Sequence, residues 1–337
     1  MKINQEKVLV TGASGYIALH CIAELLKKGY RVKGSLRDLN RQDEVRKSLA
    51  LEAEYEKLEF CKLNLLDNQG WEAAASDCDY LLHIASPCSI EEPTNEKQLI
   101  KPALKGTLSA LKAAQKSNVK KVVLTSSIGA IAYGHSKSTC DPTDWTDTSK
   151  DVGAYIKSKT IAEKAAWDFM TNQSDTSFTM TTIHPGMVFG PLLSNAIEGM
   201  SAGLITKMIS GKFLALPDIY FTVVDVRDIA KLHVESITNK QSDHKRIIAT
   251  SQQAISFLEI SKILRELGFN KSPQNRIPTQ LINSLAIFNI GMKNTASMIK
   301  RGCYSVDTSE TISLYDWDPI PFKKTLKDMT KSLKTMS

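Results

Sequence analysis

The stretch KVLVTGASGYIA, residues 7–18, decides the fold class of this chain. It begins as an apolar run and reaches Gly12, a pattern typical of a buried strand that ends in a turn. Gly12, Gly15 and Ala18 follow at intervals of three residues and lead into a segment with helical periodicity. This spacing allows a sharp turn, a close approach of the backbone to a pyrophosphate, and tight packing of helix on strand. It predicts a dinucleotide-binding unit, the alternative being a tight turn that binds no ligand.

The residues that follow repeat the alternation of strand and helix. Apolar runs predict further strands at 31–37, 58–64, 79–86, 119–127 and 177–191, the last ending at Pro185. Helical periodicity predicts helices at 16–30, 41–58, 95–117 and 153–170. Strands joined through helices of this length form right-handed crossovers and a parallel sheet. The fold class predicted is therefore α/β, a Rossmann-type doubly wound parallel sheet.

The alternation of strand and helix ends after about residue 190, where short helices and strands follow without a repeat or a low-complexity linker. We therefore expect an NADP-binding Rossmann domain at 1–190 and a smaller C-terminal α/β lobe, mainly for substrate, at 191–337. Segments near 219–250, with strand-like runs near 222 and 247, are expected to rejoin the sheet, so the boundary is not clean.

Composition excludes several classes of protein. The chain has 337 residues, 42% of them hydrophobic and 23% charged, as in an ordinary globular protein. It has no apolar run of about 18 residues, which argues against a membrane span, and no signal-peptide pattern, so a cytoplasmic location is expected. The net charge of +7 reflects solvated lysines or attraction of an anionic cofactor or substrate, and no basic run with interleaved aromatics suggests nucleic acid. The six cysteines show neither a Cys-x-x-Cys pair nor zinc spacing, so no metal site is predicted.

The end of the second predicted strand, GSLRDLNR at 34–41, bears on the choice of cofactor. An acidic residue here holds the ribose 2′-hydroxyl of NAD, whereas an arginine accommodates the 2′-phosphate of NADP. Ser35 or Leu36 is expected to face the ribose, with Arg37 next and Arg41 one turn further on. A guanidinium suits phosphate, which favours NADP(H). A shift of the strand end by two residues would instead make Asp38 the marker of NAD, and Arg37 could be a solvated loop residue.

Three polar residues suggest the chemistry. The fifth predicted strand ends in LTSS at Ser126 and Ser127, and carboxyl ends of parallel strands are where ligands bind in such sheets. Tyr155 and Lys159 follow, four residues apart on one face of a predicted helix. Carbonyl reduction needs a proton donor such as tyrosine, a cation that favours its phenolate, and a hydroxyl that stabilises the developing oxyanion. By itself the Tyr–Lys pair is a weak signal, since it also occurs by chance on ordinary helices.

With these residues in place the chain resembles the extended short-chain dehydrogenases/reductases, in particular the dihydroflavonol-reductase-like branch. That branch includes plant dihydroflavonol and cinnamoyl-CoA reductases and yeast methylglyoxal/ketone reductase. The resemblance extends over nearly the whole chain. It rests on the segments TGASGYIA, GSLRD, LLHIASP, VVLTSS, AYIKSKTIAEKAAWDF, HPGMVFGP and VVDVRDIAKLH.

The resemblance implies a role for each matching position. Ser127, Tyr155 and Lys159 would form the catalytic set, with Tyr155 and Lys159 also touching the cofactor. The other cofactor contacts implied are Gly12, Ala13, Ser14, Gly15, Tyr16 and Ile17 around the pyrophosphate, Arg37 with Arg41 at the 2′-phosphate, Asn64 and Leu65 at the adenine, Ala85 and Ser86 near the ribose and phosphates, Pro185 and Val188 at the nicotinamide, and Ser201.

Two departures from the branch bear on specificity. Many relatives have Asp–Leu where this chain has Asn64–Leu65, which would alter the adenine contact. Plant dihydroflavonol reductases have an asparagine five residues after the serine, where this chain has Ala132. Ala132, with Ile128 and Ile131, suggests an apolar wall and argues against flavonoid substrates. The segment 133–153 is expected to border the substrate.

The function predicted is NADPH-dependent reduction of aldehydes or ketones. The expected partner is a small-molecule carbonyl substrate, with no nucleic acid or membrane. The expected oligomeric state is a monomer or a homodimer. A 3β-hydroxysteroid dehydrogenase or a sugar-nucleotide epimerase would use the same fold and residues. A non-catalytic NADP-sensing regulator is the alternative from another class, although such proteins usually lose the Tyr or the Lys.

Overall fold

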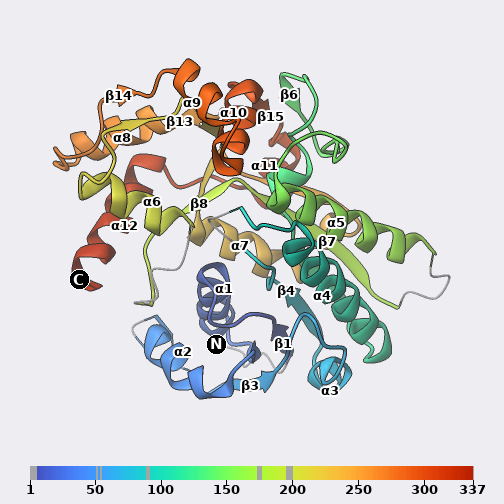
Figure 1. The fold of residues 1–337 in the computed structure, drawn as a ribbon. Coiled ribbons are helices and arrows are strands. Elements are labelled where there is room, and N and C mark those ends of the chain that lie inside the picture. The colour runs from blue at the N-terminus through green and yellow to red at the C-terminus, as the bar shows by residue number, and fades with distance from the viewer. Residues whose placement is uncertain are drawn as a thin grey trace.

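The computed structural model describes residues 6–50, 52–53, 55–88, 92–172, 177–194 and 200–336. Its centre is a seven-stranded sheet in the order β12-β7-β5-β4-β1-β2-β3 (Figure 1). The strands are β1 (Lys7–Val10), β2 (Arg31–Leu36), β3 (Leu58–Lys62), β4 (Tyr80–His83), β5 (Lys121–Thr125), β7 (Thr179–Pro185) and β12 (Arg246–Ala249). All neighbouring pairs are parallel. The Rossmann-type α/β fold expected from the sequence is confirmed.

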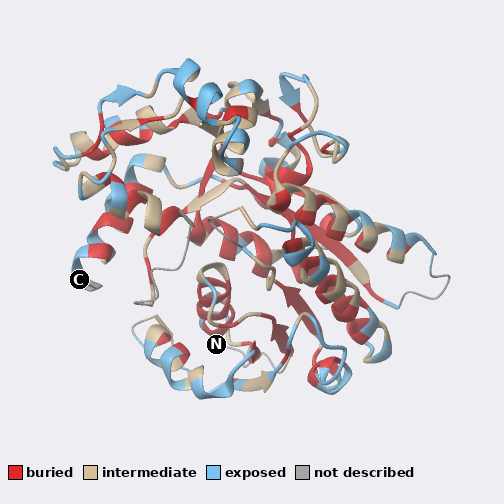
Figure 2. Ribbon diagram, in the orientation of Figure 1, coloured by how far each residue is buried: buried red, intermediate tan, exposed pale blue. Residues whose placement is uncertain are grey.

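Helices cover both faces of this sheet because its strands alternate between two cores. Val8 and Val10 pack into one apolar cluster, whereas Leu9 packs into the other. The first cluster includes side chains of α1 (Tyr16–Lys27), α2 (Gln42–Leu49) and α7 (Val226–Ser236). The second includes side chains of α3 (Trp71–Ala75), α4 (Lys97–Lys116) and α5 (Ala154–Asn172). Figure 2 accordingly shows the central strands buried and the outer surfaces of the helices exposed.

The strand order places a crevice at the site of interest. From β1 the chain moves outward through β2 and β3 and then returns to β4 on the other side of β1. The helices that follow β1 and β4, α1 and α4, pack on opposite faces of the sheet, and ligands bind at such switch points in open α/β sheets. β5 and β7 continue the same edge, so the loops after all these strands lie along one side of the sheet.

The remaining elements gather mainly beyond that edge. The helices are α6 (Met200–Ile209), α8 (Phe257–Glu266), α9 (Thr279–Leu285), α10 (Ile290–Arg301), α11 (Ser309–Tyr315) and α12 (Phe322–Met336). Short strands form two-stranded pairs: β8 (Met187–Phe189) with β11 (Val223–Asp225), β6 (Thr139–Cys140) with β15 (Ser305–Val306), β9 (Ala215–Leu216) with β14 (Asn275–Arg276), and β10 (Tyr220–Phe221) with β13 (Ile255–Ser256). In Figure 1 α8, α9 and α10 lie at the opposite end of the molecule from α2 and α3. None of the helices within the described residues is both long and apolar enough to cross a membrane.

Several helices and strands end at other residues than the sequence predicts. The helix expected at 41–58 is limited to α2, and the strands expected to end at Gly12 and Ser127 end at Val10 and Thr125. Of the two C-terminal strand-like runs, the one near 247 is β12 and pairs with β7, while the one near 222 is β11 and pairs with β8 outside the seven-stranded sheet. The division into domains at residue 190 stays a prediction.

Gly186 explains why the segment 177–191 is not one strand. A Cβ at this position would lie 2.0 Å from Thr250 Oγ1 and 2.4 Å from the carbonyl oxygen of Thr222. The backbone can therefore pass from β7 to β8, and from one sheet to the other, only where no side chain is present. This crossing fixes the positions of Pro185 and Val188 relative to the sheet.

Gly186→Ala is expected to lower the free energy of unfolding by about 1–3 kcal/mol, since a methyl group would overlap backbone atoms that cannot move away independently. Urea unfolding followed by circular dichroism measures this. The matched control is Gly291→Ala in α10, where the nearest atom to the new methyl group is the side-chain oxygen of Asn289 at 3.1 Å and no backbone atom of another element lies within 4 Å. Equal stability of the two variants would contradict the steric explanation.

Candidate active site

The turn after β1 has the geometry of a phosphate-binding loop. Gly12 has φ of +72°, and a Cβ there would lie 3.1 Å from the Cβ of Ala85 in the loop after β4. Gly15 is the N-cap of α1, and the first turn of that helix contains neither a capping side chain nor an acidic residue. Its N–H groups and the positive end of its dipole are thus available to an anion. Ala13, Ser14, Tyr16 and Ile17 belong to this same turn and first helical turn.

Thr11 and His83 hold the two loops of the crevice together, and sequence reasoning did not single them out. The Thr11 hydroxyl oxygen accepts the N–H groups of Ile84 and Ala85, each at 3.0 Å, and lies 3.0 Å from His83 Nδ1. With both N–H groups donating to it, the hydroxyl donates its own proton to Nδ1, which leaves the His83 proton on Nε2. Burial lowers the pKa of His83 to about 3, so the ring is neutral. A short polar residue between strand and first glycine, and a histidine at the end of a buried strand, were the available signals.

At the end of β2 the structure corrects what was expected of Ser35 and Leu36, and it leaves the guanidinium of Arg37 available to a ligand. Ser35 and Leu36 are both buried, and Ser35 Oγ accepts the N–H of Gly12 at 3.1 Å, so the expectation that either faces a ribose is wrong. Arg37 is the first exposed residue, and its guanidinium has no hydrogen-bond or ion-pair partner within the described part of the chain. Asp38 accepts the N–H of Asn40 and so caps a short turn, while Arg41 forms two hydrogen bonds with Glu44.

The residues expected at the adenine follow the next strand. The N–H of Leu63 donates to the carbonyl of Leu36, which brings Asn64 to the same edge of the sheet as Arg37. Asn64 is exposed, and its Oδ1 accepts the N–H of Leu66 at 3.0 Å. Leu65 packs on α4 so closely that a Cβ on Gly106 would lie 2.4 Å from it.

The other expected cofactor positions divide into two groups. Ala85 and Ser86 follow β4, Pro185 ends β7, and Val188 lies in β8, so these four share the carboxyl edge. Ser201 is buried near the beginning of α6, next to Ala202, whose apolar cluster also includes Tyr16.

Ser127, Tyr155 and Lys159 come together where β5 ends. Ser127 Oγ accepts the N–H of Gly129, so its hydroxyl proton remains available to a further acceptor. Lys159 is buried on α5 and donates from Nζ to the carbonyl of Thr125 at 3.0 Å. Burial raises the pKa of Tyr155 above its usual value, nearby Cys88 adds to this, and a hydrogen bond with Ser127 opposes it. Burial lowers the pKa of Lys159 to about 8, with Cys88 and Glu163 opposing.

Further side chains fix this corner, and the sequence analysis did not name them. The Thr125 hydroxyl lies 2.7 Å from His233 Nε2, while His233 Nδ1 donates to the carbonyl of Ile229 at 2.8 Å. Glu92 Oε1 accepts the N–H of Ala154, the first residue of α5, at 2.7 Å. Cys88 is exposed and lies near enough to Tyr155 and Lys159 to affect the pKa of each.

The apolar wall expected from Ile128, Ile131 and Ala132 is not a surface of the site. All three are buried in an apolar cluster with Tyr304 and Val306, and Ile131 and Ala132 have no exposed area. Sequence alone could not show this, because the segment turns inward through a single 3₁₀ turn, Ile128–Ala130. The segment before Tyr155 instead faces α10: Lys293 pairs with Asp151 at 2.9 Å, and a Cβ on Gly153 would lie 4.0 Å from Asn294.

These features define a Rossmann-type dinucleotide-binding protein with a polar reaction site beside its glycine turn. Residues 8–249 match the family described as "NAD dependent epimerase/dehydratase family", and the chain belongs to that family. The resemblance to extended short-chain dehydrogenases/reductases is thereby confirmed, as is the expectation of an oxidoreductase that uses a nicotinamide cofactor.

Individual relatives are mostly reductases. A cinnamoyl-CoA reductase of Medicago truncatula is 37% identical over 77% of this chain and 80% of its own. A bifunctional dihydroflavonol 4-reductase/flavanone 4-reductase of Malus domestica is 32% identical over 83% and 80%. Among solved structures, Gre2 of Candida albicans in complex with NADPH superposes with a TM-score of 0.81 at 24% identity, covering 98% of this chain and 99% of that one.

Thr11→Val is expected to lower the free energy of unfolding by about 1–3 kcal/mol. The substitution keeps the shape but leaves two N–H groups and His83 Nδ1 without their partner. Urea unfolding measures the effect, and Thr11→Ser, which keeps the hydroxyl, is the control. A valine variant as stable as the serine variant would show that water satisfies these groups.

Proposed function

We propose that this protein reduces aldehydes or ketones to alcohols with NADPH as the reductant, and that Ser127, Tyr155 and Lys159 carry the reaction. The observation that supports this most directly is the convergence of a hydroxyl, a phenol and a buried ammonium at the end of β5, beside the glycine turn after β1. Relatives named as reductases at 32–37% identity support the same reaction class.

The chain's own groups fit the cofactor. The uncapped N-terminus of α1 offers N–H groups to a pyrophosphate, and the positive φ of Gly12 and its close contact with Ala85 favour glycine in the turn before that helix. Arg37 offers to a 2′-phosphate a guanidinium that no described residue pairs with, whereas the carboxylate that would mark NAD, on Asp38, is used in a turn. When bound there, the dihydronicotinamide supplies the hydride.

The residues at β5 would then handle the carbonyl oxygen. Ser127 donates a hydrogen bond to it, which stabilises the negative charge that develops. Tyr155 transfers its proton to the same oxygen, so that the carbonyl becomes an alcohol. Burial raises the pKa of the phenol and so keeps it protonated at neutral pH, as an acid must be. The Lys159 ammonium would favour the phenolate that remains.

The specific substrate is not defined by the fold. A UDP-glucose 4-epimerase of Thermotoga maritima superposes with a TM-score of 0.75 at 19% identity, so the same framework also supports epimerisation. Because Ala132 is buried, the absence of an asparagine there says little about flavonoids. NADPH consumption with methylglyoxal, a benzaldehyde, cinnamoyl-CoA and dihydroquercetin tests the reductase proposal. UDP-glucose conversion tests the epimerase, and binding of NADPH without turnover of any of these would point to a regulator.

Tyr155→Phe is expected to reduce kcat for carbonyl reduction by about 10²–10⁴-fold, because the proton donor is lost. NADPH affinity, measured by fluorescence titration, should change little, since the ring remains. Wild-type turnover in this variant would contradict the role of Tyr155.

Arg37→Ala is expected to weaken NADPH binding by roughly 1.5–3 kcal/mol, the value of a charge-assisted hydrogen bond, and to leave NADH binding nearly unchanged. Arg41→Ala is the control, because the Arg41 guanidinium already pairs with Glu44. Equal losses for both cofactors in the Arg37 variant would mean that this residue only shapes the loop. A selective loss in the Arg41 variant alone would transfer the phosphate contact to Arg41.

A further inference from the structure

Glu163 is a buried carboxylate that the proposed reaction does not use. It lies on α5 one turn after Lys159 and is 1% exposed. A small cavity is lined by both residues together with Ser126, His83, Ala85 and Ser86, so Glu163 adjoins the proposed site directly. Five side chains donate to its oxygens: Ser126 at 2.5 Å, Arg246 at 2.7 Å, His184 at 2.8 Å, Trp167 at 3.1 Å and Thr182 at 3.3 Å.

Such a carboxylate is costly to bury unless it is fully hydrogen-bonded. The residues that donate to Glu163 show which parts of the chain these hydrogen bonds connect. Ser126 directly precedes Ser127, and His184 directly precedes Pro185. The same carboxylate therefore ties the ends of β5 and β7 to the helix that carries Tyr155 and Lys159. A shift of Glu163 would therefore displace Ser126 and His184, and with them the neighbouring Ser127 and Pro185.

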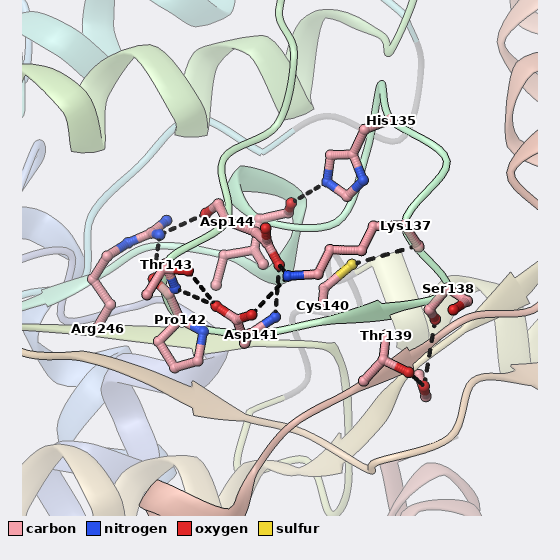
Figure 3. A network of polar contacts seen from close by, with 12 residues as sticks. His135, Lys137, Ser138, Thr139, Cys140, Asp141, Pro142, Thr143, Asp144 and Arg246 are labelled. Atoms are coloured by element: carbon pink, nitrogen blue, oxygen red, sulfur yellow. Dashed lines mark hydrogen bonds and ion pairs between the residues drawn. The ribbon is translucent and has the colours of Figure 1, made fainter.

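Arg246 extends this connection to the segment before Tyr155. Its Nε donates to Glu163, while its Nη1 donates to the carbonyl oxygens of Pro142 and Asp144, each at 2.6 Å. The guanidinium also stacks on the ring of Trp145 at 3.7 Å. Figure 3 shows Arg246 reaching these carbonyls, with the same loop braced by ion pairs from Lys137 to Asp141 and Asp144. One guanidinium thus clamps the loop at 141–145 to the buried carboxylate.

The charge of Glu163 acts on Lys159 as well. Burial alone would raise the pKa of Glu163, but His184 and Arg246 hold it well below its usual value, so the group is an anion. Burial also lowers the pKa of His184. The other groups that interact electrostatically with Lys159 are Cys88 after β4, His83 on β4 and His233 on α7, and burial keeps both of these imidazoles neutral.

We propose that Glu163 is a positioning residue: its buried carboxylate fixes Ser127, Pro185 and, through Arg246, the loop at 141–145, which belongs to the segment expected to border the substrate, and it supports the ammonium of Lys159. This inference rests on the proposed reductase function and names a residue that would act through Lys159 and the loop, without touching the substrate.

The first test compares pH profiles of kcat for Glu163→Gln and wild type. Glutamine keeps the size but removes the charge and one acceptor oxygen, so Lys159 should lose its proton more readily. The alkaline limb should move to lower pH by about half a unit or more, and KM for the carbonyl should rise about three- to tenfold. Asp168→Asn, which neutralises an exposed carboxylate on the same helix, is the control and should change neither quantity.

The second test separates the effect of Glu163 on the loop at 141–145 from the effect of its charge on Lys159. Arg246→Lys keeps a cation but cannot stack on Trp145 and reach two carbonyls at once. KM should rise while the alkaline limb stays in place. Acrylamide quenching of Trp145 fluorescence should increase in this variant and in Glu163→Gln. The Trp145 signal is the difference between each protein and the same protein with Trp145→Phe.

The outcomes are decisive in each case. The proposal is overturned, while the reductase function stands, if the Glu163→Gln enzyme keeps the wild-type KM and the wild-type alkaline limb of the kcat profile. The same holds if this enzyme loses only stability. If that variant does not fold, Glu163→Asp takes its place: a raised KM with an unmoved limb supports the proposal, and an unchanged KM overturns it. If wild type reduces no carbonyl, the proposed function fails, and Trp145 quenching alone decides whether Glu163 and Arg246 hold the loop.

Discussion

The close approach of two backbones at the carboxyl ends of β1 and β4 is the constraint on which the site depends. A Cβ on Gly12, which has φ of +72°, would lie only 3.1 Å from the Cβ of Ala85, and the Thr11 hydroxyl bridges the two loops by satisfying two N–H groups and one imidazole nitrogen. The glycine turn can open the N-terminus of α1 toward the crevice only because this contact holds the opposite wall in place. The residues after β5 and β7 then line up along the same edge, since all these strands are parallel.

Buried polar side chains fix the loops that the sheet itself leaves free. His83 connects to the loop after β1, His233 connects the end of β5 to α7, and Glu163 connects β5 and β7 to α5. Buried polar groups of this kind must find partners, and the partners here belong to different segments of the chain. The framework is common to reductases and an epimerase, whereas the side chains at the loops would carry the distinction between them.

The sequence predicts the parts of this structure that are governed by local pattern. Apolar runs locate the central strands, helical spacing locates the helices between them, and the glycine spacing after β1 identifies the turn. The expectation that Ser127 lies at the ligand-binding edge follows from the rule that ligands bind at the carboxyl ends of parallel strands. Long-range contacts were not predictable in this way. Nothing in the local pattern of residues 128–132 shows that Ala132 turns into an apolar cluster with Tyr304, or that Arg246, 83 residues from Glu163 along the chain, reaches it through β12. Ser35 was misjudged for the same reason, because its partner Gly12 lies on the neighbouring strand's turn.

The opposite effects of burial on Tyr155 and Lys159 bear on the direction of the proposed reaction. Burial disfavours whichever form is charged, so it raises the pKa of the phenol and lowers that of the ammonium. A phenol that keeps its proton at neutral pH is ready to donate it, which is what reduction of a carbonyl requires, whereas oxidation of an alcohol needs the phenolate. With its pKa at about 8, Lys159 remains mostly charged at neutral pH and can stabilise the phenolate once it has formed. Glu163 opposes the loss of that charge from within the same cavity. The buried carboxylate, although it lies outside the groups of the proposed reaction, thus favours the charged form of Lys159.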